Sequence, residues 1–268
     1  MIKTAVIMAA GKGTRFGDRT AAMPKGFIQF NGRPMIERSI ENLLSVGIRD
    51  IIIGTGYHKE WYEALQEKYS QIKTVFSPEF ANTNSMETLY RCRTAVAGRD
   101  FLLLESDIVY DPKALECLLT DSHEDIMLAS EITKFQDQYY IAVDKDFNLL
   151  MCSTDKDKLI KETGEKPYGE LVGIHKISDC FYQRMIEDYE THRKDNLKRG
   201  YEFEIEDIAT GCHSNGTIKA QPIDRTHLCH IQERGMVPMY VLKLADLQWY
   251  EIDDLEDLAF AEKHVKIA

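Results

Sequence analysis

Residues 1–107 alternate short apolar runs with amphipathic stretches, and this alternation constrains the fold more than any other feature. Four runs read as strands: Lys3–Met8, Ile51–Ile53, Ile72–Phe76 and Phe101–Leu104. Three stretches have apolar residues at helical spacing: Pro34–Val46, Trp61–Tyr69 and Ser85–Val96. Strands that are apolar on both faces and alternate with helices predict an α/β fold, with a mostly parallel sheet covered on both sides.

The second half of the chain is less regular. We expect strands at Ile126–Ser130, Tyr139–Val143, Phe147–Cys152, Leu171–Ile177, Tyr240–Leu244 and Trp249–Ile252. Helices are predicted at Cys180–Arg193 and Asp254–His264, whereas the polar stretch Cys152–Lys166 predicts a loop or hairpin. Residues 211–238 have no clear periodicity. Because no linker or repeat divides the chain, we expect a single domain over residues 1–268, with a smaller β-rich substrate lobe.

The charge balance excludes a class of function. The chain has 33 basic and 44 acidic residues, which gives a formal charge of −11. Such a protein has no general field that collects nucleic acid, so any phosphate must be bound by a local basic pocket. The six cysteines have no C-x-x-C spacing, and no apolar run reaches the length of a signal peptide or a membrane span. We therefore expect a cytoplasmic protein without nucleic-acid or membrane partners, and a homodimer as the default oligomer.

A glycine-rich loop with two cations follows the first predicted strand. Residues 8–17 read MAAGKGTRFG, and residues 23–25 read MPK. Glycines let backbone amides approach a ligand closely, and amides in such a turn form a concave anion site. Arg15 and Lys25 add positive charge where a phosphate would lie. The loop is not a Walker A motif, because it lacks the pattern G-x-x-x-x-G-K-[ST]. It is not a dinucleotide fingerprint either, because Phe16 stands where that pattern needs its third glycine. A plain β-turn with surface cations is the alternative.

This loop resembles the signature of the sugar-nucleotide-type nucleotidyltransferases, which is roughly A-A-G-x-G-x-R followed about ten residues later by P-K. The resemblance implies a Rossmann-like nucleotidyltransferase fold whose loop wraps a nucleoside triphosphate. By position, Arg15 and Lys25 would be the catalytic residues that hold the phosphates. The loop residues expected to bind the nucleotide are Ala9, Ala10, Gly11, Gly13 and Thr14. Residues 1–110 would then form the nucleotide-binding half and residues 111–268 the acceptor-binding half.

Two acidic segments resemble the metal site of this family. Residues 104–107 read LESD at the end of an apolar strand, where the family places a metal-binding aspartate. Residues 249–258 read WYEIDDLEDL and resemble the family's closing E-I-D-x-x-x-D-L segment. The resemblance therefore assigns Mg²⁺ to Asp107 and Asp253, since this ion prefers hard oxygen ligands. Helix capping is the competing role, and we assign it to Asp254, which has capping-box spacing to Asp257.

A third segment resembles a narrower branch. Residues 80–90 read FANTNSMETLY and resemble the small cytidylyltransferases of phosphocholine and 2-aminoethylphosphonate. In that branch the segment lies beside the nucleotide base, so Asn84 and Ser85 are candidate base contacts. Capping of the predicted helix is the competing explanation. Ser106, next to the metal aspartate, is a further candidate for nucleotide binding.

The acceptor site is predicted from charge. A phospho- or phosphono-amine needs carboxylates or aromatic faces at its cationic end. The candidates are Asp137, Tyr139, Tyr140, Glu204, Glu206 and Asp207. A primary ammonium donates three hydrogen bonds and prefers carboxylates, whereas a quaternary ammonium prefers aromatic rings. The acidic residues at 202–207 favour a primary amine, although an ordinary acidic helix start explains them equally well.

Together these features predict a CTP- and Mg²⁺-dependent cytidylyltransferase. It would transfer CMP to 2-aminoethylphosphonate, release pyrophosphate, and so serve phosphonate decoration of lipids or glycans. Phosphocholine, a sugar phosphate and a hydroxyalkylphosphonate are the alternative acceptors, and an inactive nucleotide sensor is the non-enzyme alternative. A zinc site is disfavoured, because its candidates lack standard ligand spacing: Cys212, His213, His227, Cys229 and His230.

Overall fold

The computed structural model describes residues 2–133, 138–211, 221–222 and 235–267. Its first half confirms the predicted alternation of strands and helices. The main elements are β1 (Thr4–Ala9), α2 (Met35–Ser45), β4 (Asp50–Thr55), α3 (Lys59–Lys68), β5 (Ile72–Phe76), α4 (Ser85–Arg91), α5 (Arg93–Val96) and β6 (Phe101–Glu105). Short elements link β1 to α2: η1 (Thr14–Phe16), α1 (Asp18–Ala22), η2 (Lys25–Phe27), β2 (Gln29–Phe30) and β3 (Arg33–Pro34).

The second half contains more helix than the sequence predicted. Its elements are β7 (Ile108–Tyr110), α6 (Lys113–Thr120), β8 (Ile126–Ser130), β9 (Tyr140–Val143), β10 (Leu149–Ser153), α7 (Lys156–Thr163), β11 (Gly169–Ile177), α8 (Asp179–His192), α9 (Tyr201–Thr210), β12 (Gln221–Pro222), β13 (Gly235–Met236), β14 (Tyr240–Leu244), β15 (Trp249–Glu251) and α10 (Leu255–His264). Helix α7 occupies the stretch predicted to be a loop or hairpin. Asp155 caps this helix by accepting a hydrogen bond from Lys158 N at 2.9 Å, and Leu159 is buried, so one apolar contact and one cap stabilise a largely polar helix.

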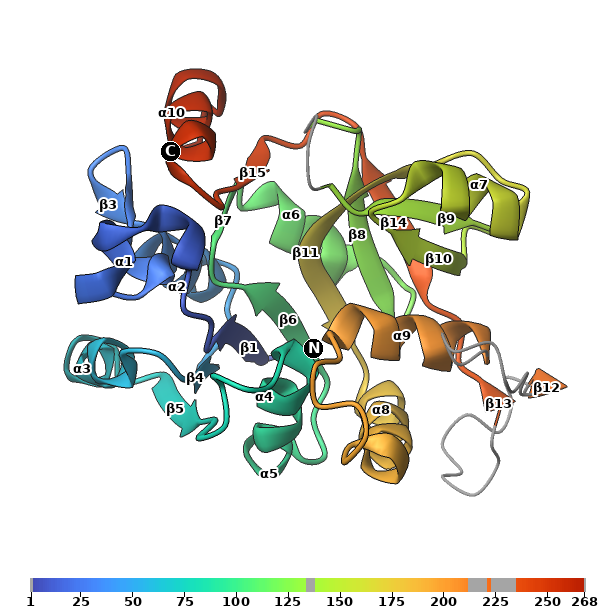
Figure 1. Ribbon diagram of the computed structural model, residues 1–268, viewed down its shortest axis with the longest axis horizontal. Helices are drawn as coiled ribbons and strands as arrows, with labels where there is room; N and C mark the ends of the chain where they lie inside the picture. The colour runs from blue at the N-terminus through green and yellow to red at the C-terminus, as the bar shows by residue number, and fades with distance from the viewer. Residues whose placement is uncertain (1, 134–137, 212–220, 223–234, 268) are drawn as a thin grey trace.

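Nine of the described strands form one sheet (Figure 1). Its order is β10-β9-β11-β6-β1-β4-β5, with β8 paired to β11 and β14 paired to β8. The four strands β5, β4, β1 and β6 are parallel, as predicted, whereas β11 runs antiparallel to β6. The carboxyl ends of β1 and β6 therefore meet at one edge, where ligands bind in sheets of this kind.

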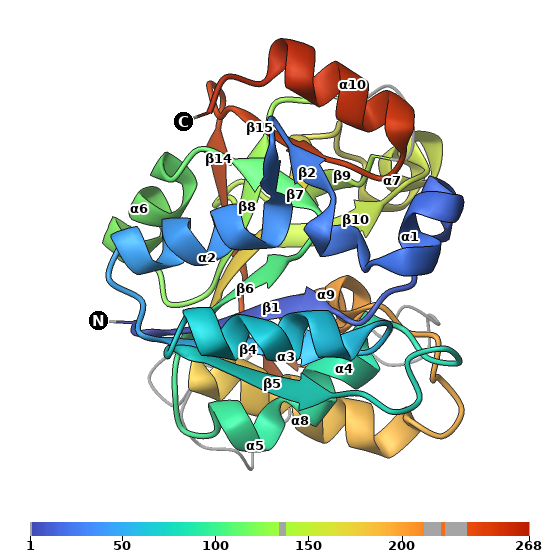
Figure 2. The same cartoon turned by 90° about the vertical axis from the view of Figure 1, so that its left-hand side faces the viewer.

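Helices cover both faces of this sheet. Ala5 and Ile7 of β1 belong to a buried cluster with side chains of α2, α3 and α6. Val6 and Met8 face the other way, into a cluster with side chains of α4, α8 and α9. Figure 2 shows the two layers above and below the central strands. No helix in the described part of the chain combines the length and the apolar character needed to cross a membrane.

A strand near the end of the chain pairs with a strand from its middle. Strand β15 pairs antiparallel with β7, so that Glu251 lies opposite Ile108, and Ile252 N donates a hydrogen bond to Asp107 O at 2.9 Å. The following helix, α10, packs its buried Leu258 and Ala261 into a cluster that also contains residues of η1 and β2. This pairing places the two aspartates predicted to bind metal side by side.

Two adjacent aspartates precede α10, and from the sequence we assign metal binding to Asp253 and helix capping to Asp254. Asp254 Oδ1 accepts hydrogen bonds from Glu256 N at 2.8 Å and Asp257 N at 2.9 Å, so the capping role assigned to Asp254 is confirmed. Asp254→Ala should lower the free energy of unfolding by about 1 kcal/mol, because two amide donors lose their acceptor. Urea denaturation measures the change. Asp254→Asn keeps a capping oxygen and is the control, so equal losses in the two variants would contradict the capping role.

Candidate functional site

A cavity of about 460 Å³ opens at the carboxyl ends of β1 and β6. It collects residues from the glycine-rich loop, from the start of α4, and from the segments that flank β7 and β15. The sequence-predicted residues that line it are Ala9, Ala10, Gly11, Gly13, Thr14, Arg15, Lys25, Asn84, Ser85, Ser106, Asp107, Tyr139 and Asp253. The structure thus brings the predicted loop, metal and phosphate-binding residues together around one space.

The glycine-rich loop lies closely against Lys25. Gly13 has φ +59°, and a Cβ at this position would lie 3.0 Å from Lys25 Cβ. Thr20 Oγ1 donates to Gly13 O at 2.9 Å and approaches Gly17 O at 3.2 Å, which holds the loop to the helix that follows. Glycine is therefore required at position 13 both for its left-handed backbone and for this close approach.

Lys25 lies between the two predicted metal ligands. Its Nζ is 2.6 Å from Asp107 Oδ2 and 2.6 Å from Asp253 Oδ1, and Arg15 Nη2 is 3.0 Å from the same Asp253 oxygen. Burial by itself lowers the pKa of Lys25, but the attraction of Asp107 and Asp253 outweighs it and raises that pKa above its ordinary value. Lys25 therefore stays protonated throughout the physiological pH range.

Three carboxylates of this cavity fit a divalent cation. Asp107, Glu251 and Asp253 each offer an oxygen, and the three oxygens lie within 4.8 Å of one another. Asp107 Oδ1 is buried and has no hydrogen-bond partner in the described part of the chain. Such a cluster suits Mg²⁺, which binds one or two carboxylates and completes its coordination shell with water and phosphate oxygens. Asp107 Oδ1 is available as one of these ligands.

Glu251 was not predicted, although the sequence carries a signal for it. The segments Glu105–Asp107 and Glu251–Asp253 both have the pattern E-x-D. Glu251 ends β15 two residues before Asp253, and its carboxylate oxygen lies within 4.8 Å of those of both aspartates. Because β7 pairs with β15, the two patterns lie side by side at the cavity.

The wall beyond the metal cluster is acidic. It contains Glu105, Glu170 and Glu202, together with the rings of Tyr139 and Tyr201. Burial and the neighbouring Asp107 raise the pKa of Glu105 well above its usual value. Burial also raises the pKa of Glu202, although a hydrogen bond with Ser85 opposes this shift. Of these five residues only Tyr139 was named as a site residue from the sequence. Glu202 belongs to the acidic stretch 202–207 that favoured a primary amine, and Glu105 lies two residues before the predicted Asp107.

Local geometry explains how part of this wall reaches the cavity. Gly173 interrupts β11 with φ +77°, and the register with β8 shifts between Leu171 and His175. A Cβ at Gly173 would lie 3.0 Å from Glu105 Cγ. The irregular strand therefore passes closely over Glu105, where a larger residue would meet its side chain.

Four predicted acceptor residues do not line the cavity, and this corrects the predicted acceptor map. Glu204 and Asp207 are buried and form ion pairs with Arg199, at 2.6 Å for Glu204. Glu206 Oε2 accepts a hydrogen bond from Cys152 N at 2.7 Å, and Tyr140 Oη accepts one from Gln138 Nε2 at 2.6 Å.

The reason lies in helix α9. Glu204 and Asp207 are three residues apart and share the face toward Arg199, whereas Glu206 lies one turn beyond Glu202 and contacts Cys152 of β10. Of this helix only Tyr201 and Glu202, in the first turn, line the cavity. Two further predictions lie outside the described residues, namely acceptor binding by Asp137 and the disfavoured zinc cluster at residues 212–230.

Asn84 and Ser85 have capping and docking roles. Asn84 Oδ1 accepts from Ser85 N at 2.8 Å, which confirms the capping interpretation. Asn84 N donates to Leu197 O at 3.0 Å, and Ser85 Oγ accepts from Tyr201 N at 3.0 Å. Both residues also line the cavity, and their contact with a base stays a prediction.

Comparisons with known proteins agree with this geometry. The sequence model of one protein family, the MobA-like NTP transferase domain, matches residues 5–194. A choline-phosphate cytidylyltransferase of Streptococcus pneumoniae is 43% identical over 94 residues, which is 35% of this chain and 41% of that protein. A 2-aminoethylphosphonate cytidylyltransferase of Lancefieldella rimae is 35% identical over 105 residues, which is 39% of this chain and 43% of that protein. The matched stretch thus spans less than half the length of either curated relative.

Solved structures extend the likeness along the whole chain. The CTP:phosphocholine cytidylyltransferase of Streptococcus pneumoniae superimposes with a TM-score of 0.72 at 21% identity, and the match covers 99% of this chain and 100% of that one. At this identity the likeness establishes the Rossmann-like nucleotidyltransferase fold. Since the family model covers most of the chain, the protein belongs to the family of MobA-like NTP transferase domains.

Proposed function

We propose that the protein is a cytidylyltransferase that transfers CMP from CTP to a small phosphonate or phosphate amine, with 2-aminoethylphosphonate as the preferred acceptor. The observation that carries the proposal is a single cavity in which an amide-rich loop, a three-carboxylate cluster and an acidic wall adjoin. The loop suits the triphosphate, the cluster suits Mg²⁺, and the wall suits an ammonium group. The similarity to cytidylyltransferases supports CTP as the nucleotide.

The proposed reaction is an in-line displacement at the α-phosphorus. An acceptor oxygen forms a bond to this phosphorus while the bond to the bridging oxygen of pyrophosphate breaks. A phosphonate acceptor is ionised at neutral pH, so no residue need remove a proton from it. Catalysis then rests on positioning and on neutralisation of charge.

The chain's own residues supply both effects in this proposal. The backbone amides of the glycine-rich loop would bind the phosphates, and Arg15 would neutralise the departing pyrophosphate. Lys25 keeps its proton on Nζ and would stabilise negative charge at the α-phosphate. Mg²⁺, held by Asp107 and Asp253 with Glu251 beside them, would supply further neutralisation at the phosphoryl oxygens.

The acidic wall favours a primary amine over a quaternary one. Glu105, Glu170 and Glu202 offer carboxyl oxygens, which can accept the three hydrogen bonds of a primary ammonium. A quaternary ammonium donates none and is bound by several aromatic faces. Here Tyr139 and Tyr201 provide only part of such an enclosure, so 2-aminoethylphosphonate fits the wall better.

Phosphocholine is the second candidate acceptor. The rings of Tyr139 and Tyr201 can contact a cationic head group, and the 94-residue match to a choline-phosphate cytidylyltransferase has 43% identity. The two candidates share the nucleotide, the metal and the reaction, and differ in what binds the nitrogen.

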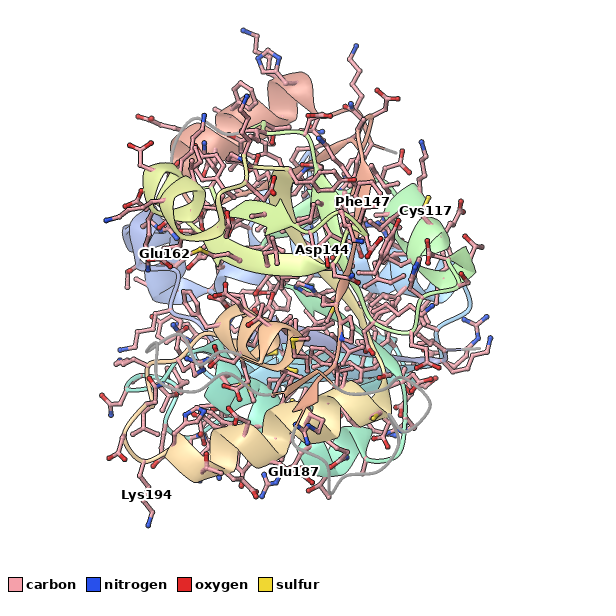
Figure 3. The ribbon with its side chains drawn as sticks, turned by 90° about the vertical axis from the view of Figure 1, so that its right-hand side faces the viewer. Cys117, Asp144, Phe147, Glu162, Glu187 and Lys194 are labelled. Carbon is pink, nitrogen blue, oxygen red and sulfur yellow. The ribbon has the colours of Figure 1, made fainter. Side chains whose placement is uncertain are left out.

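Glu202→Gln tests the acceptor assignment. We expect KM for 2-aminoethylphosphonate to rise about tenfold or more, because a charge-assisted hydrogen bond is lost. KM for CTP should stay within a factor of about two. Glu187→Gln, on the exposed face of α8 (Figure 3), is the matched control and should behave like the wild type. An unchanged KM for the amine in Glu202→Gln would remove Glu202 from the acceptor site.

Asp107→Asn tests the metal assignment. We expect kcat to fall at least 100-fold at saturating Mg²⁺, because a carboxylate ligand becomes a neutral amide. Asp111→Asn makes the same chemical change in a residue whose side chain accepts from Lys113 N at 2.8 Å, and it should retain activity. Circular dichroism of both variants checks the fold. Full Mg²⁺-dependent turnover by Asp107→Asn would contradict the assignment.

A further inference from the structure

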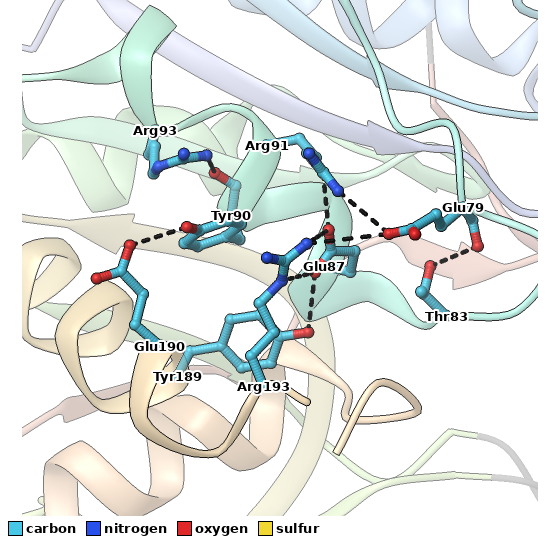
Figure 4. Close-up of polar contacts among 9 residues, drawn as sticks. All are labelled: Glu79, Thr83, Glu87, Tyr90, Arg91, Arg93, Tyr189, Glu190 and Arg193. Atoms are coloured by element: carbon cyan, nitrogen blue, oxygen red, sulfur yellow. Dashed lines mark hydrogen bonds and ion pairs between the residues drawn. The ribbon is translucent and has the colours of Figure 1, made fainter. Parts of the chain in front are cut away.

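A buried carboxylate lies at the centre of an ion-pair network next to the cavity (Figure 4). Glu87 on α4 is fully buried. Arg193 Nε donates to Glu87 Oε2 at 2.6 Å, and Arg193 Nη2 donates to Oε1 at 2.6 Å. Arg91 Nε donates to Oε1 at 2.7 Å, and Tyr189 Oη donates to Oε2 at 3.2 Å. The carboxylate is therefore surrounded by donors from α4, from α8 and from Arg193, the residue that follows α8.

Arg193, like Tyr189, links Glu87 to a separate part of the chain, and it does so from the segment that follows α8. Arg91 lies one turn beyond Glu87 on the same helix, so its ion pair stays within α4. Arg193 directly follows α8 and binds Glu87 through two nitrogens, while its guanidinium also lies 4.7 Å from the centre of the Tyr90 ring. This forked and stacked geometry requires arginine, because a lysine ammonium cannot form both parallel hydrogen bonds.

Arg193 begins the connecting segment, residues 193–200, which joins α8 to α9. This segment docks on the N-terminus of α4 through backbone hydrogen bonds. Asn84 N donates to Leu197 O at 3.0 Å, and Met86 N donates to Arg199 O at 3.2 Å. The segment leads directly into Tyr201, whose N donates to Ser85 Oγ at 3.0 Å.

The connecting segment determines where two cavity residues lie. Tyr201 and Glu202 form the first turn of α9 and belong to the acidic wall. Helix α4 is itself held in the core by the buried side chains of Met86 and Leu89. Loss of the Arg193 contact should therefore loosen the connecting segment while α4 stays in place.

We propose that Arg193 is a positioning residue for the acceptor site: its ion pair with Glu87 anchors the connecting segment to α4 and so holds Tyr201 and Glu202 in the cavity. The identity of the acceptor in this inference rests on the proposed function. The anchoring itself does not, because it follows from contacts between residues of this chain.

Arg193→Gln tests the positioning role by steady-state kinetics. We expect KM for 2-aminoethylphosphonate to rise about tenfold, with kcat and KM for CTP within about twofold of the wild type. With 2-hydroxyethylphosphonate, which lacks the amine, KM should not change. Lys194→Gln removes a neighbouring charge that points into solvent (Figure 3) and is the matched control. Arg193→Lys should restore only part of the affinity. An equal fall of kcat with all acceptors, or an unchanged KM for the amine, would overturn the proposal.

Hydrogen exchange tests the anchoring without catalysis. In Arg193→Gln the amides of Met86 and Tyr201 should exchange about tenfold faster than in the wild type, and in Lys194→Gln they should not. Unchanged exchange in Arg193→Gln would overturn the anchoring. If the wild-type protein released no pyrophosphate with the amine, the proposed function would fail, and exchange at these amides would still decide the role of Arg193.

Discussion

The antiparallel pairing of β7 with β15 is the constraint on which the rest of the cavity depends. It brings Asp107 and Asp253 together from distant parts of the chain, and the ammonium of Lys25 lies 2.6 Å from each. Carboxylates this close repel one another unless a cation lies between them. Lys25 supplies that cation here, and its position in turn requires the close approach of Gly13. The glycine-rich loop and the closing segment are therefore arranged around the same group of charges.

The same arrangement explains how one cavity can serve two substrates. The loop after β1 and the N-terminus of α4 form one side, where we propose that the nucleotide binds. The first turn of α9 and the irregular part of β11 form the other, acidic side. Ser85 lies at the boundary, because its hydroxyl accepts a hydrogen bond from Tyr201 N. In our account, Arg193 anchors the connecting segment, and this segment fixes the position of the acidic side relative to the nucleotide side.

The sequence predicted the first half of the fold well, because local periodicity determines those elements. The parallel order of β5, β4, β1 and β6 follows from their alternation with helices. The loop and Asp107 could be placed together because each follows an apolar strand, whereas Asp253 was assigned to the same site only from the resemblance of residues 249–258 to the family's closing segment. Helix α7 was not, because its polar composition conceals a capping residue and one buried leucine.

The acceptor side was predicted less well, for a physical reason. Composition located acidic residues at 202–207, but it could not give the rotation of α9 about its axis. That rotation directs Glu202 into the cavity and Glu204 toward Arg199. Glu170 reaches the cavity through long-range strand pairing, which leaves no local pattern in the sequence.

Pyrophosphate release in the presence of Mg²⁺ tests the central claim most directly. The assay crosses CTP, UTP, GTP and ATP with 2-aminoethylphosphonate, phosphocholine and glucose 1-phosphate. Our account predicts release with CTP alone among the nucleotides, and fastest release with 2-aminoethylphosphonate. Preference for phosphocholine would retain the reaction but contradict the role of the acidic wall. Absence of release in every combination, from protein shown to be folded, would contradict the proposed activity.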